Sequence, residues 1–285
     1  MTDEIREIIK TALKEDVASG DITTKATITG NIPAKGIFLV KDEGIIAGFE
    51  VVEEVFKTVD KNLVFLKNLK DGYHVKNGDI AAIVEGSAAS ILTAERTALN
   101  FFQRISGIAT MANRFRELVR HTDAKIIDTR KTAPGLRAVD KLAVKLGGCD
   151  NHRIGLYDMF LIKDNHIAVA GSIIKAVQAC VDYRNALSEK FLIEVETTNL
   201  IEVGEAVKSG ADIIMLDNFD IVEMGKAVKL INKKCKVEAS GGVNLYTVKD
   251  IAETGVDYIS VGILTHSVKA LDISLNVELS RTNAR

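Results

Sequence analysis

The sequence predicts an α/β protein made of two differently built parts, the larger of which is a (β/α) barrel. Short β-type runs separated by glycine turns occupy residues 35–84, whereas strands and helices alternate from Lys125 onward. A run in which apolar and polar residues strictly alternate lies near the end of the chain. With 285 residues, the chain is long enough for one large α/β domain or for two smaller ones.

The first third begins with a helix and continues with short strands. The segment MTDEIREIIKTALKED is predicted to form an amphipathic acidic helix rather than a signal peptide. An Asp-Gly pair at 71–72 and an Asn-Gly pair at 77–78 predict tight turns between strands, because these pairs adopt the positive φ angles that such turns require.

A long helix and a returning tail are predicted on either side of the barrel. Apolar residues at helical spacing extend from about residue 90 to residue 121, and we expect this helix to bend or break near Ser106-Gly107. The segment ALDISLNVEL at 270–279 has the alternation of a half-buried strand. Because this pattern matches the amino-terminal region, we expect the tail to pack with the first domain.

From Lys125 onward, the alternation of short apolar strands with helices predicts a parallel sheet. Short apolar strands recur roughly every 20 to 35 residues, which is the repeat length of βα units. Their nearly continuous apolar character indicates that both faces of the sheet are covered. Six clear repeats, with a less regular further one, favour a barrel over an open doubly wound sheet. The six segments are KIID, DMFLIKDN, FLIEVET, DIIMLDN, KVEASGG and DYISVG.

The composition argues against nucleic-acid and membrane partners. Lys and Arg total 37 against 39 Asp and Glu, so no overall positive field would attract either partner. No apolar stretch approaches the roughly 18 residues that a membrane span needs. The three cysteines are far apart in the sequence and fit neither a zinc site nor a disulfide framework. We therefore expect a cytoplasmic protein.

Charged and hydroxyl side chains stand at the carboxyl ends of the predicted strands, where the active sites of βα barrels lie. Unpaired charges inside an apolar barrel would cost several kcal/mol each. We therefore expect these side chains to converge at one mouth and to neutralise one another and a ligand. In strand order they are Arg130 and Lys131, Lys163, Glu194 and Glu196, Asp217, Glu238 with Ser240 and Gly241, and finally Gly262.

The glutamates at this mouth allow both a structural and a ligand-binding interpretation. Glu194 and Glu196 are two residues apart and face the same side of a strand. We interpret Glu194 as a counter-charge for the cations, and Glu196, which is nearer the strand end, as the ligand candidate. Glu238 is expected to be a structural partner of Lys131 or Lys163.

Two further features of the mouth favour an anionic ligand. Glycines after the last two strands, at Gly241 and Gly262, allow backbone N–H groups to approach a phosphate. The loop before the second strand places His152 next to Arg153, although a lone histidine is most often a structural residue. No histidines pair at metal-ligand spacing. The cations of this mouth predict a substrate with several anionic groups, and the acids predict a sugar with two hydroxyl groups that they can bind.

Eight motifs along the chain carry a resemblance to one enzyme family. They are GDITT (20–24), ERTALNFFQRISGIAT (95–110), DTRKTAPGLR (128–137), NHRIGLYDMFLIKDNHI (151–167), IEVET (193–197), MLDN (215–218), EASGGV (238–243) and SVGILTHS (260–267). Together they resemble quinolinate phosphoribosyltransferase (decarboxylating), also called nicotinate-nucleotide pyrophosphorylase. The resemblance implies conversion of quinolinate and phosphoribosyl pyrophosphate to nicotinate mononucleotide, pyrophosphate and carbon dioxide in de novo NAD biosynthesis.

The family resemblance also implies an architecture and an assembly. It implies an incomplete, seven-stranded α/β barrel and an α+β sandwich-type domain. We place the sandwich-type domain at residues 1–108, joined by 268–285, and the barrel at 109–267. It further implies a dimer or a hexamer in which each active site takes Arg96 from the neighbouring subunit.

The roles of the site residues follow from the same resemblance. It implies that Arg130, Arg153 and Lys163, with the partner's Arg96 and with His152 nearby, bind quinolinate. Lys131, between the two substrates, Glu196 and Asp217 are the implied catalytic residues. The two acids would bind the ribose hydroxyls and Mg²⁺ of phosphoribosyl pyrophosphate. The implied ligands of the 5′-phosphate are Ser240, Gly241, Gly262 and His266.

Two alternatives remain open from the sequence. One is the sister family associated with molybdenum transport, which shares the barrel and many cationic motifs. The other is a non-catalytic barrel that binds sugar phosphates. The motifs around Arg96 and Arg153 favour quinolinate over the first alternative. The presence of Glu196 and Asp217 beside the cations argues against the second.

Overall fold

The structure is a computed structural model that describes residues 1–280, and the chain forms two compact units. We call them the antiparallel unit and the parallel unit after their main sheets. Each unit is assembled from separate stretches of sequence. The antiparallel unit contains Met1–Asn113, Ala133–Gly148 and the chain from Ser267, and the parallel unit contains Arg114–Thr132 and Cys149–His266.

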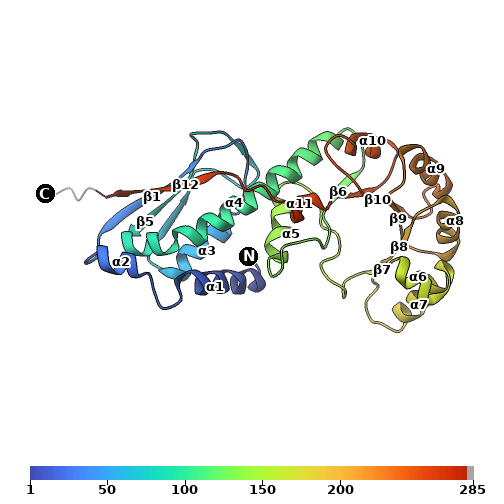
Figure 1. The fold of residues 1–285 in the computed structure, drawn as a ribbon, viewed down its shortest axis with the longest axis horizontal. Helices are drawn as coiled ribbons and strands as arrows, with labels where there is room; N and C mark the ends of the chain where they lie inside the picture. Colours follow the sequence, from blue (N-terminus) through green and yellow to red (C-terminus); the bar gives the residue numbers. More distant parts are fainter. Residues whose placement is uncertain (281–285) are drawn as a thin grey trace. The chain divides into compact units, whose positions relative to one another are not determined.

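The antiparallel unit is built on a four-stranded sheet in the order β12-β1-β5-β3. Figure 1 shows β1, β5 and β12 side by side, although β12 comes from the end of the chain. A second sheet pairs β2 with β4. The strands are β1 (Pro33–Val40), β2 (Gly44–Ile46), β3 (Val64–Lys67), β4 (Tyr73–Val75), β5 (Ile80–Ser87) and β12 (Ile273–Leu279). The helices are α1 (Asp3–Val17), α2 (Ile22–Thr27), α3 (Phe49–Val59), α5 (Arg137–Leu146) and most of α4 (Ala88–Val119).

Aromatic side chains fill the interior of the antiparallel unit. Phe38 and Phe102 are fully buried, and their ring centroids lie 5.6 Å apart with the edge of one ring against the face of the other. Phe102 meets Phe49 in the same manner at 5.1 Å, and Phe38 meets Phe56 at 5.9 Å. Such pairs add to the free energy gained from burying the rings. The long helix α4 is thereby held against the sheet.

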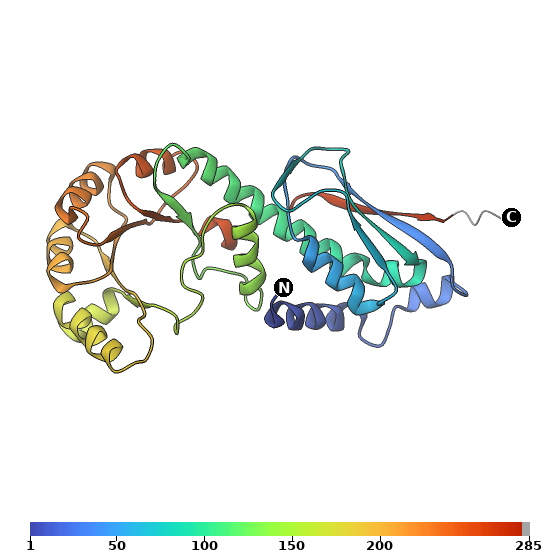
Figure 2. The ribbon, with the colours of Figure 1, turned by 180° about the vertical axis from the view of Figure 1, so that it is seen from behind.

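The parallel unit is built on six parallel strands in the order β6-β11-β10-β9-β8-β7. Figure 1, and Figure 2 from behind, show the helices on the outer side of the curved sheet. The strands are β6 (Lys125–Ile127), β7 (Phe160–Ile162), β8 (Ile193–Thr197), β9 (Ile213–Asp217), β10 (Lys236–Ser240) and β11 (Tyr258–Ser260). The helices are α6 (Asp164–Ala170), α7 (Ile173–Asn185), α8 (Leu200–Ser209), α9 (Ile221–Ile231), α10 (Val248–Glu253) and α11 (Ile263–His266).

Three helices of the parallel unit begin at polar capping residues. The side chain of Ser172 accepts the Lys175 N–H at the start of α7. Asn199 and Asp220 accept backbone N–H groups in the same way at the starts of α8 and α9. A side-chain oxygen at this position satisfies a backbone donor that has no partner within the helix. The caps of α8 and α9 therefore fix where the chain leaves a strand and turns back into a helix, and the cap of α7 fixes where it restarts after α6.

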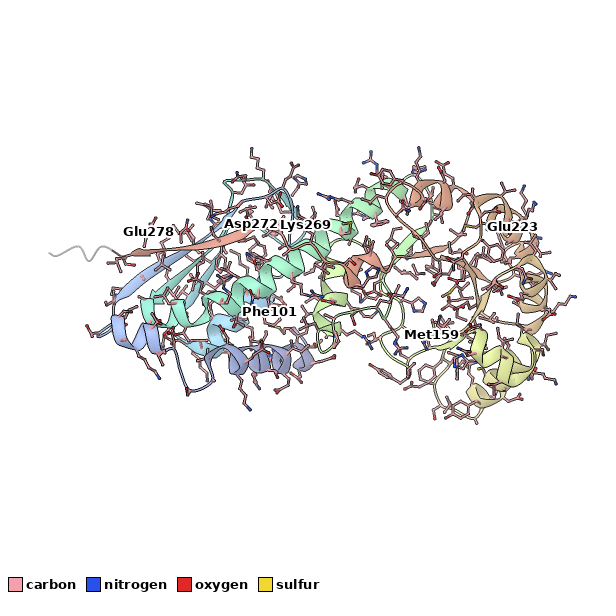
Figure 3. All side chains as sticks on the ribbon, in the orientation of Figure 1. Phe101, Met159, Glu223, Lys269, Asp272 and Glu278 are labelled. Atoms are coloured by element: carbon pink, nitrogen blue, oxygen red, sulfur yellow. The ribbon has the colours of Figure 1, made fainter. Side chains whose placement is uncertain are left out.

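The α/β class and the separation into a parallel and an antiparallel sheet are confirmed, as is the return of the tail. β12 pairs along its length with β1, so the end of the chain completes the first sheet. The predicted break near Ser106-Gly107 is wrong, because α4 is continuous. A Cβ at Gly107 would lie 2.2 Å from the carbonyl oxygen of Lys269, so this glycine allows a close approach of the chain. Figure 3 labels Lys269 where it crosses α4.

The compact units differ in detail from the predicted domain limits. The units assign Ala133–Gly148 to the antiparallel unit, whereas the predicted barrel domain at 109–267 includes it. Residues 281–285 of the predicted carboxyl-terminal segment lie outside the described residues. None of the helices that the structure describes is both long and apolar enough to span a membrane.

Candidate functional site

A cavity of about 560 Å³ opens at the carboxyl ends of the parallel strands. The cations from three separate segments, Arg130, Arg153 and Lys163, all line it. Their meeting was the central expectation from the sequence. Nine of the predicted site residues line this cavity, and they are Arg130, Lys131, His152, Arg153, Lys163, Glu196, Asp217, Ser240 and Gly241.

Lys163 and Glu196 form the most direct ion pair at the mouth. The Lys163 Nζ lies 2.7 Å from a Glu196 carboxylate oxygen, so it joins the ends of β7 and β8. The Lys163 side chain is 47% exposed and the Glu196 side chain 13%. A half-exposed ammonium group beside a carboxylate remains available to a second anion that enters from solvent.

The end of β9 forms a tight polar corner with the end of β10. The Asn218 N–H donates to the Ser240 carbonyl at 2.9 Å, and its side-chain amide donates to Asp217 at 2.8 Å. A Cβ on Gly241 would lie 2.2 Å from the Asn218 side-chain oxygen, and Gly241 has a φ of +90°. Only glycine fits at this point without strain. The corner holds Asp217 at the cavity wall.

Lys131 lies against the end of β11 and the short helix α11. The Thr265 hydroxyl donates to the Lys131 carbonyl at 2.9 Å. A Cβ on Gly262 would lie 3.3 Å from the Lys131 side chain and 3.1 Å from the His266 ring. Gly262 and His266 are therefore close to Lys131, but they are not among the residues that line the cavity.

The Arg153 guanidinium lines the cavity beside a second cation, Arg130. Burial and the positive charge of Arg130 lower the pKa of Arg153. The Arg153 Nη1 donates to the Met159 carbonyl at 3.2 Å, and its Nε is buried without a hydrogen-bond partner among the described residues. Figure 3 labels Met159 just before β7. A buried donor without an acceptor costs free energy, so an anion bound here would be strongly favoured.

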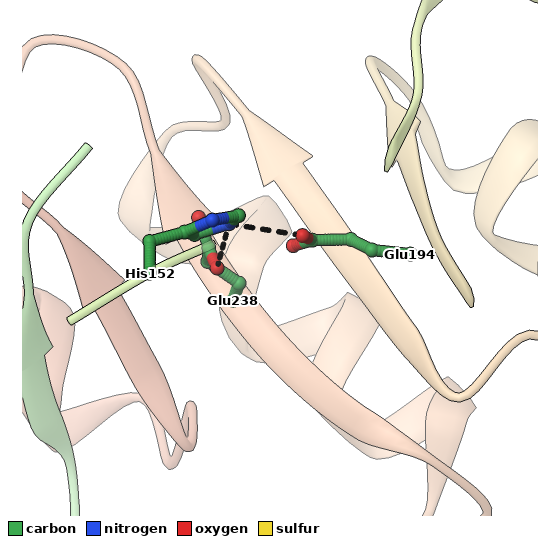
Figure 4. Close-up of side chains that lie close together, drawn as sticks. All are labelled: His152, Glu194 and Glu238. Atoms are coloured by element: carbon green, nitrogen blue, oxygen red, sulfur yellow. Dashed lines mark hydrogen bonds and ion pairs between the residues drawn. The ribbon is translucent and has the colours of Figure 1, made fainter. Parts of the chain in front are cut away.

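His152, Glu194 and Glu238 form a buried cluster, which Figure 4 shows. The His152 Nε2 lies 3.0 Å from a Glu194 oxygen and 3.4 Å from a Glu238 oxygen. The side chains of both glutamates are almost completely buried. The expectation that Glu238 pairs with Lys131 or Lys163 is therefore wrong, since its ionic partner is His152. Neither spacing nor periodicity could show that the loop before β7 places an imidazole between β8 and β10.

Burial and mutual contact shift the pKa values of two groups in this cluster, His152 and Glu194. Burial opposes the charged form of His152, but hydrogen bonds to Glu194 and Glu238 outweigh it and raise its pKa to about 10. Burial and the neighbouring Glu238 carboxylate raise the pKa of Glu194 to about 7. His152 Nδ1 also accepts the Arg153 N–H at 2.7 Å, which a ring protonated on both nitrogens could not do. The hydrogen bond at Nδ1 places the ring proton of His152 on Nε2, so the raised affinity for a proton belongs to the coupled cluster and not to a doubly protonated ring.

The same hydrogen bond argues against a metal ion in this cluster. One imidazole and two carboxylates are a plausible ligand set, and their ligand atoms lie within 4.8 Å of one another. A histidine that binds a metal normally donates its second ring N–H to an acceptor. Here the second nitrogen, Nδ1, accepts instead. The proton must then occupy Nε2, the atom that a metal would need.

The predicted site residue Arg96 does not line the cavity, and some residues that do line it had no predicted role. Arg96 is exposed on α4 in the antiparallel unit. Asn218 lines the cavity but had no predicted role, although an asparagine with a φ of 57° directly after a strand marks a constrained turn. The other lining residues without a predicted role are Thr129, Leu161, Met215 and Ser260.

The fold and the site define an α/β protein with a cavity, lined by several cations, where its parallel strands end. Family models agree with the motifs. The model of the quinolinate phosphoribosyl transferase C-terminal domain matches residues 108–276, and that of the N-terminal domain matches residues 21–106. The chain belongs to the quinolinate phosphoribosyltransferase family, as the motifs predicted.

Individual relatives resemble the chain over nearly its whole length. It is 45% identical to quinolinate phosphoribosyltransferase [decarboxylating] 2b, mitochondrial, of Nicotiana tabacum, over 97% of this chain and 83% of the relative. It is 44% identical to the probable nicotinate-nucleotide pyrophosphorylase [carboxylating] of Bacillus subtilis, over 97% of this chain and 94% of the relative. The crystal structure of NadC from Streptococcus pyogenes matches with a TM-score of 0.92 and 38% identity, covering 98% of this chain and all of that one.

Proposed function

We propose that this protein converts quinolinate and phosphoribosyl pyrophosphate to nicotinate mononucleotide, pyrophosphate and carbon dioxide, in de novo NAD biosynthesis. One observation carries the proposal: Arg130, Arg153 and Lys163 meet at one cavity, which Glu196 and Asp217 also line. Positive side chains suit a pyridine dicarboxylate, and the acids suit the hydroxyls of a ribose. The names of the relatives support the same reaction.

The quinolinate carboxylates would lie at the arginines and Lys163. The buried Nε of Arg153 is a donor that awaits an acceptor, and Arg130 adds a second guanidinium at the same wall. Lys163 stands at the end of β7 and is half exposed. An arginine binds a carboxylate through two parallel hydrogen bonds, which also fixes the plane of the pyridine ring.

Phosphoribosyl pyrophosphate would occupy the other side of the cavity. We assign the ribose hydroxyls to Glu196 and Asp217, and the 5′-phosphate to the backbone around Ser240, Gly241 and Gly262, with His266 close by. Gly241 has a positive φ, and its backbone lines the cavity, which supports the assignment. Lys131 lies between the two subsites.

In this reaction the protein mainly positions reactants and stabilises charge. The pyridine nitrogen of quinolinate attacks C1 of the ribose as the bond to pyrophosphate breaks. Glu196 and Asp217 stabilise the positive charge that develops on the ribose, and Lys131 offsets the negative charge on pyrophosphate. The quaternised nitrogen then withdraws electrons from C2, whose carboxylate leaves as carbon dioxide and is replaced by a proton. No side chain needs to act as the nucleophile.

We propose Mg²⁺ as the cofactor that enters with phosphoribosyl pyrophosphate. Carboxylate oxygens are the ligands that Mg²⁺ prefers, and it is often held by one or two carboxylates together with substrate phosphates. Glu196 and Asp217 both line the cavity and fit this requirement. When bound, the ion would neutralise charge on the pyrophosphate.

We further propose that the parallel unit is the incomplete, seven-stranded barrel that the resemblance implied. The segment at Asp150 is the candidate for the seventh strand, since it forms a parallel bridge with Ile127 of β6. The limits 1–108 with 268–285, and 109–267, remain our proposal for the domains. We place the enzyme in the cytoplasm, consistent with its three free cysteines.

The turnover assay tests the proposed function directly. Purified protein with Mg²⁺, phosphoribosyl pyrophosphate and quinolinate should release carbon dioxide and nicotinate mononucleotide, and omission of quinolinate should abolish both. Tight binding of phosphoribosyl pyrophosphate without turnover would instead favour a sugar-phosphate-binding barrel. Turnover with another acceptor but not with quinolinate would favour the sister family associated with molybdenum transport.

We propose that the protein works as a homo-oligomer, a dimer or a hexamer, in which Arg96 completes the quinolinate site of a neighbouring subunit. Its exposed position on α4, in a different compact unit from the cavity, is consistent with this role. An inactive Arg96→Ala chain mixed with an inactive Lys163→Ala chain should partly regain activity, because a mixed dimer contains one intact site. If exchange of differently tagged subunits is demonstrated and no activity returns, the shared site is refuted.

A further inference from the structure

We propose that His152 is a positioning residue, held by Glu194 and Glu238 so that its other ring nitrogen fixes Arg153 for the substrate carboxylate. This inference rests on the proposed function, which it deepens. It differs from a role in which the imidazole itself binds quinolinate. The hydrogen bonds of the two ring nitrogens of His152 distinguish these two roles.

Both ring nitrogens of His152 are used within the protein. Nε2 lies 3.0 Å from Glu194 and 3.4 Å from Glu238, and Nδ1 accepts the backbone N–H of Arg153 at 2.7 Å. The side chain is only 7% exposed. A neutral imidazole has one donor and one acceptor, and these contacts use both of them. The ring therefore touches the cavity with its edge, while its polar atoms point to protein groups.

The backbone around His152 is held as firmly as the ring. The His152 N–H donates to Asp128 at 2.8 Å, and the Asp128 side chain is completely buried at the end of β6. Two residues earlier, Asp150 bridges to Ile127 of the same strand. The segment is thus tied to β6 through its backbone, and to β8 and β10 through the imidazole. A displacement of the ring would shift the adjacent Arg153.

The guanidinium of Arg153 is held by the loop that precedes β7, which is itself closed by hydrogen bonds to Asp158. Its Nη1 donates to the Met159 carbonyl, and Asp158 accepts the N–H groups of Ile154 and Gly155. The Nε remains buried without an acceptor among the described residues. The Arg153 backbone is held by His152, and one terminal guanidinium nitrogen is held by Met159. The Nε–H of Arg153 therefore points in one defined direction. That direction is what a substrate carboxylate requires, because a misplacement of about 1 Å can cost about 100-fold in rate.

The two glutamates would have distinct uses in this arrangement. One acceptor at Nε2 is enough to select the tautomer in which Nδ1 accepts. A second acceptor on a different strand prevents rotation of the ring out of its plane. Burial of two carboxylates is costly for stability, and a pair of apolar residues would fill the same space at lower cost. Their presence is therefore best explained by the orientation that they impose.

The test uses glutamine and leucine at the same position. Glu194→Gln keeps an oxygen that can accept from Nε2, whereas Glu194→Leu removes it at similar volume. We expect Glu194→Leu to raise the KM for quinolinate about 10–100-fold, with the KM for phosphoribosyl pyrophosphate changed less than about threefold. Glu194→Gln should recover most of this loss. Glu223→Leu on α9, outside the cavity, is the matched control for the exchange.

A spectroscopic measurement on the wild-type protein keeps the test independent of whether Glu194→Leu folds. Nitrogen-15 NMR of histidine-labelled protein should show His152 as a neutral ring with the proton on Nε2, assigned by its loss in His152→Asn. A ring protonated on both nitrogens would overturn the inference, as would equal rises of KM for both substrates. Wild-type protein that does not turn over quinolinate would refute the proposed function instead, while the tautomer still tests the hydrogen bond to Arg153.

Discussion

The two compact units fill their interiors with different chemistry. The antiparallel unit is centred on aromatic rings, among them the fully buried Phe38 and Phe102. The parallel unit buries Asp128 directly after β6, Glu194 within β8 and Glu238 within β10. An apolar side chain contributes to stability wherever it is buried, whereas a buried charge costs free energy unless it is paired.

The two interiors therefore have different roles. In the antiparallel unit, burial and ring contacts account for the packing of α4 on the sheet. In the parallel unit, the buried acids hold His152 and, through it, the segment that carries Arg153. Substitutions in the first interior should therefore lower the free energy of unfolding, whereas substitutions at the end of the parallel sheet should mainly lower activity.

The largest expected effect is on activity, at Lys163. We expect Lys163→Ala to lower kcat/KM for quinolinate about 1000-fold, because the substrate loses a cation and Glu196 is left facing it uncompensated. Binding of phosphoribosyl pyrophosphate, measured by calorimetry, should weaken far less. The melting temperature should change little, since the side chain is half exposed. Equal loss for both substrates would show that Lys163 is wrongly assigned, and Lys175→Ala, on an exposed position of α7, is the control.

The next effect is on stability, at Phe102. Phe102→Ala should lower the free energy of unfolding by about 3–5 kcal/mol, because it leaves a cavity between Phe38 and Phe49. Urea denaturation measures this loss. The KM values of the remaining folded protein should stay unchanged. Tyr73→Ala, which removes a ring that is 56% exposed, should cost much less. A changed KM with an unchanged urea midpoint would contradict the proposed division between the two interiors.

The ion pair between Arg104 and the buried Asp140 in the antiparallel unit sharpens the comparison. Arg104 binds both carboxylate oxygens of Asp140 at 2.8 Å, and the Asp140 side chain is completely buried. Asp140→Asn should therefore lower the free energy of unfolding by about 3 kcal/mol, since it leaves a guanidinium without its counter-charge. Thermal and urea unfolding would measure the loss.

A double substitution tests whether this pair serves stability alone. Arg104→Met combined with Asp140→Leu should recover most of the stability lost in Asp140→Asn, because apolar residues of similar size often replace a buried ion pair without loss. Failure of the double variant to recover would show that the charges also impose a specific geometry. The pair would then resemble the cluster around His152 rather than the aromatic interior.

Strand ends and motif positions could be predicted from the sequence, because both depend on local pattern. The apolar runs that end in Arg130, Lys163 and Asp217 each became a parallel strand or its end, and their side chains reach one cavity. The carboxyl ends of parallel strands lie on the same edge of a sheet, so convergence followed from strand direction alone.

Partners across the sheet could not be predicted, because periodicity gives the face of a strand and not its neighbour. Glu238 was expected to pair with a lysine, but β10 faces the segment of His152 instead. The break expected at Gly107 was wrong for a similar reason. A glycine within a helix indicates either a bend or a close contact, and only the position of Lys269 decides between them.

The smallest expected effect is the pH dependence of a surface pair in the antiparallel unit. Burial opposes ionisation of Glu53, but hydrogen bonds from Lys57 and Lys67 outweigh it and lower the pKa of Glu53 below 4.5. A carboxylate with a lowered pKa stabilises the folded state above its unfolded pKa, and this contribution is lost as the pH falls through the folded pKa. Glu53→Gln should therefore reduce stability at pH 7 by less than about 1 kcal/mol and have no effect near pH 2.

Urea midpoints for Glu53→Gln between pH 2 and pH 7 would show whether this contribution exists. Glu15→Gln, at an exposed position on α1, should leave the pH profile unchanged. A loss at pH 7 that persisted at pH 2 would mean that packing of the Glu53 side chain, and not its charge, is responsible. These measurements also compare exposed charges with the buried acids of the parallel unit. Because solvent screens the charges around Glu53, they stabilise the fold only slightly. The buried acids of the parallel unit instead cost stability, which is why we attribute their presence to the orientation of His152.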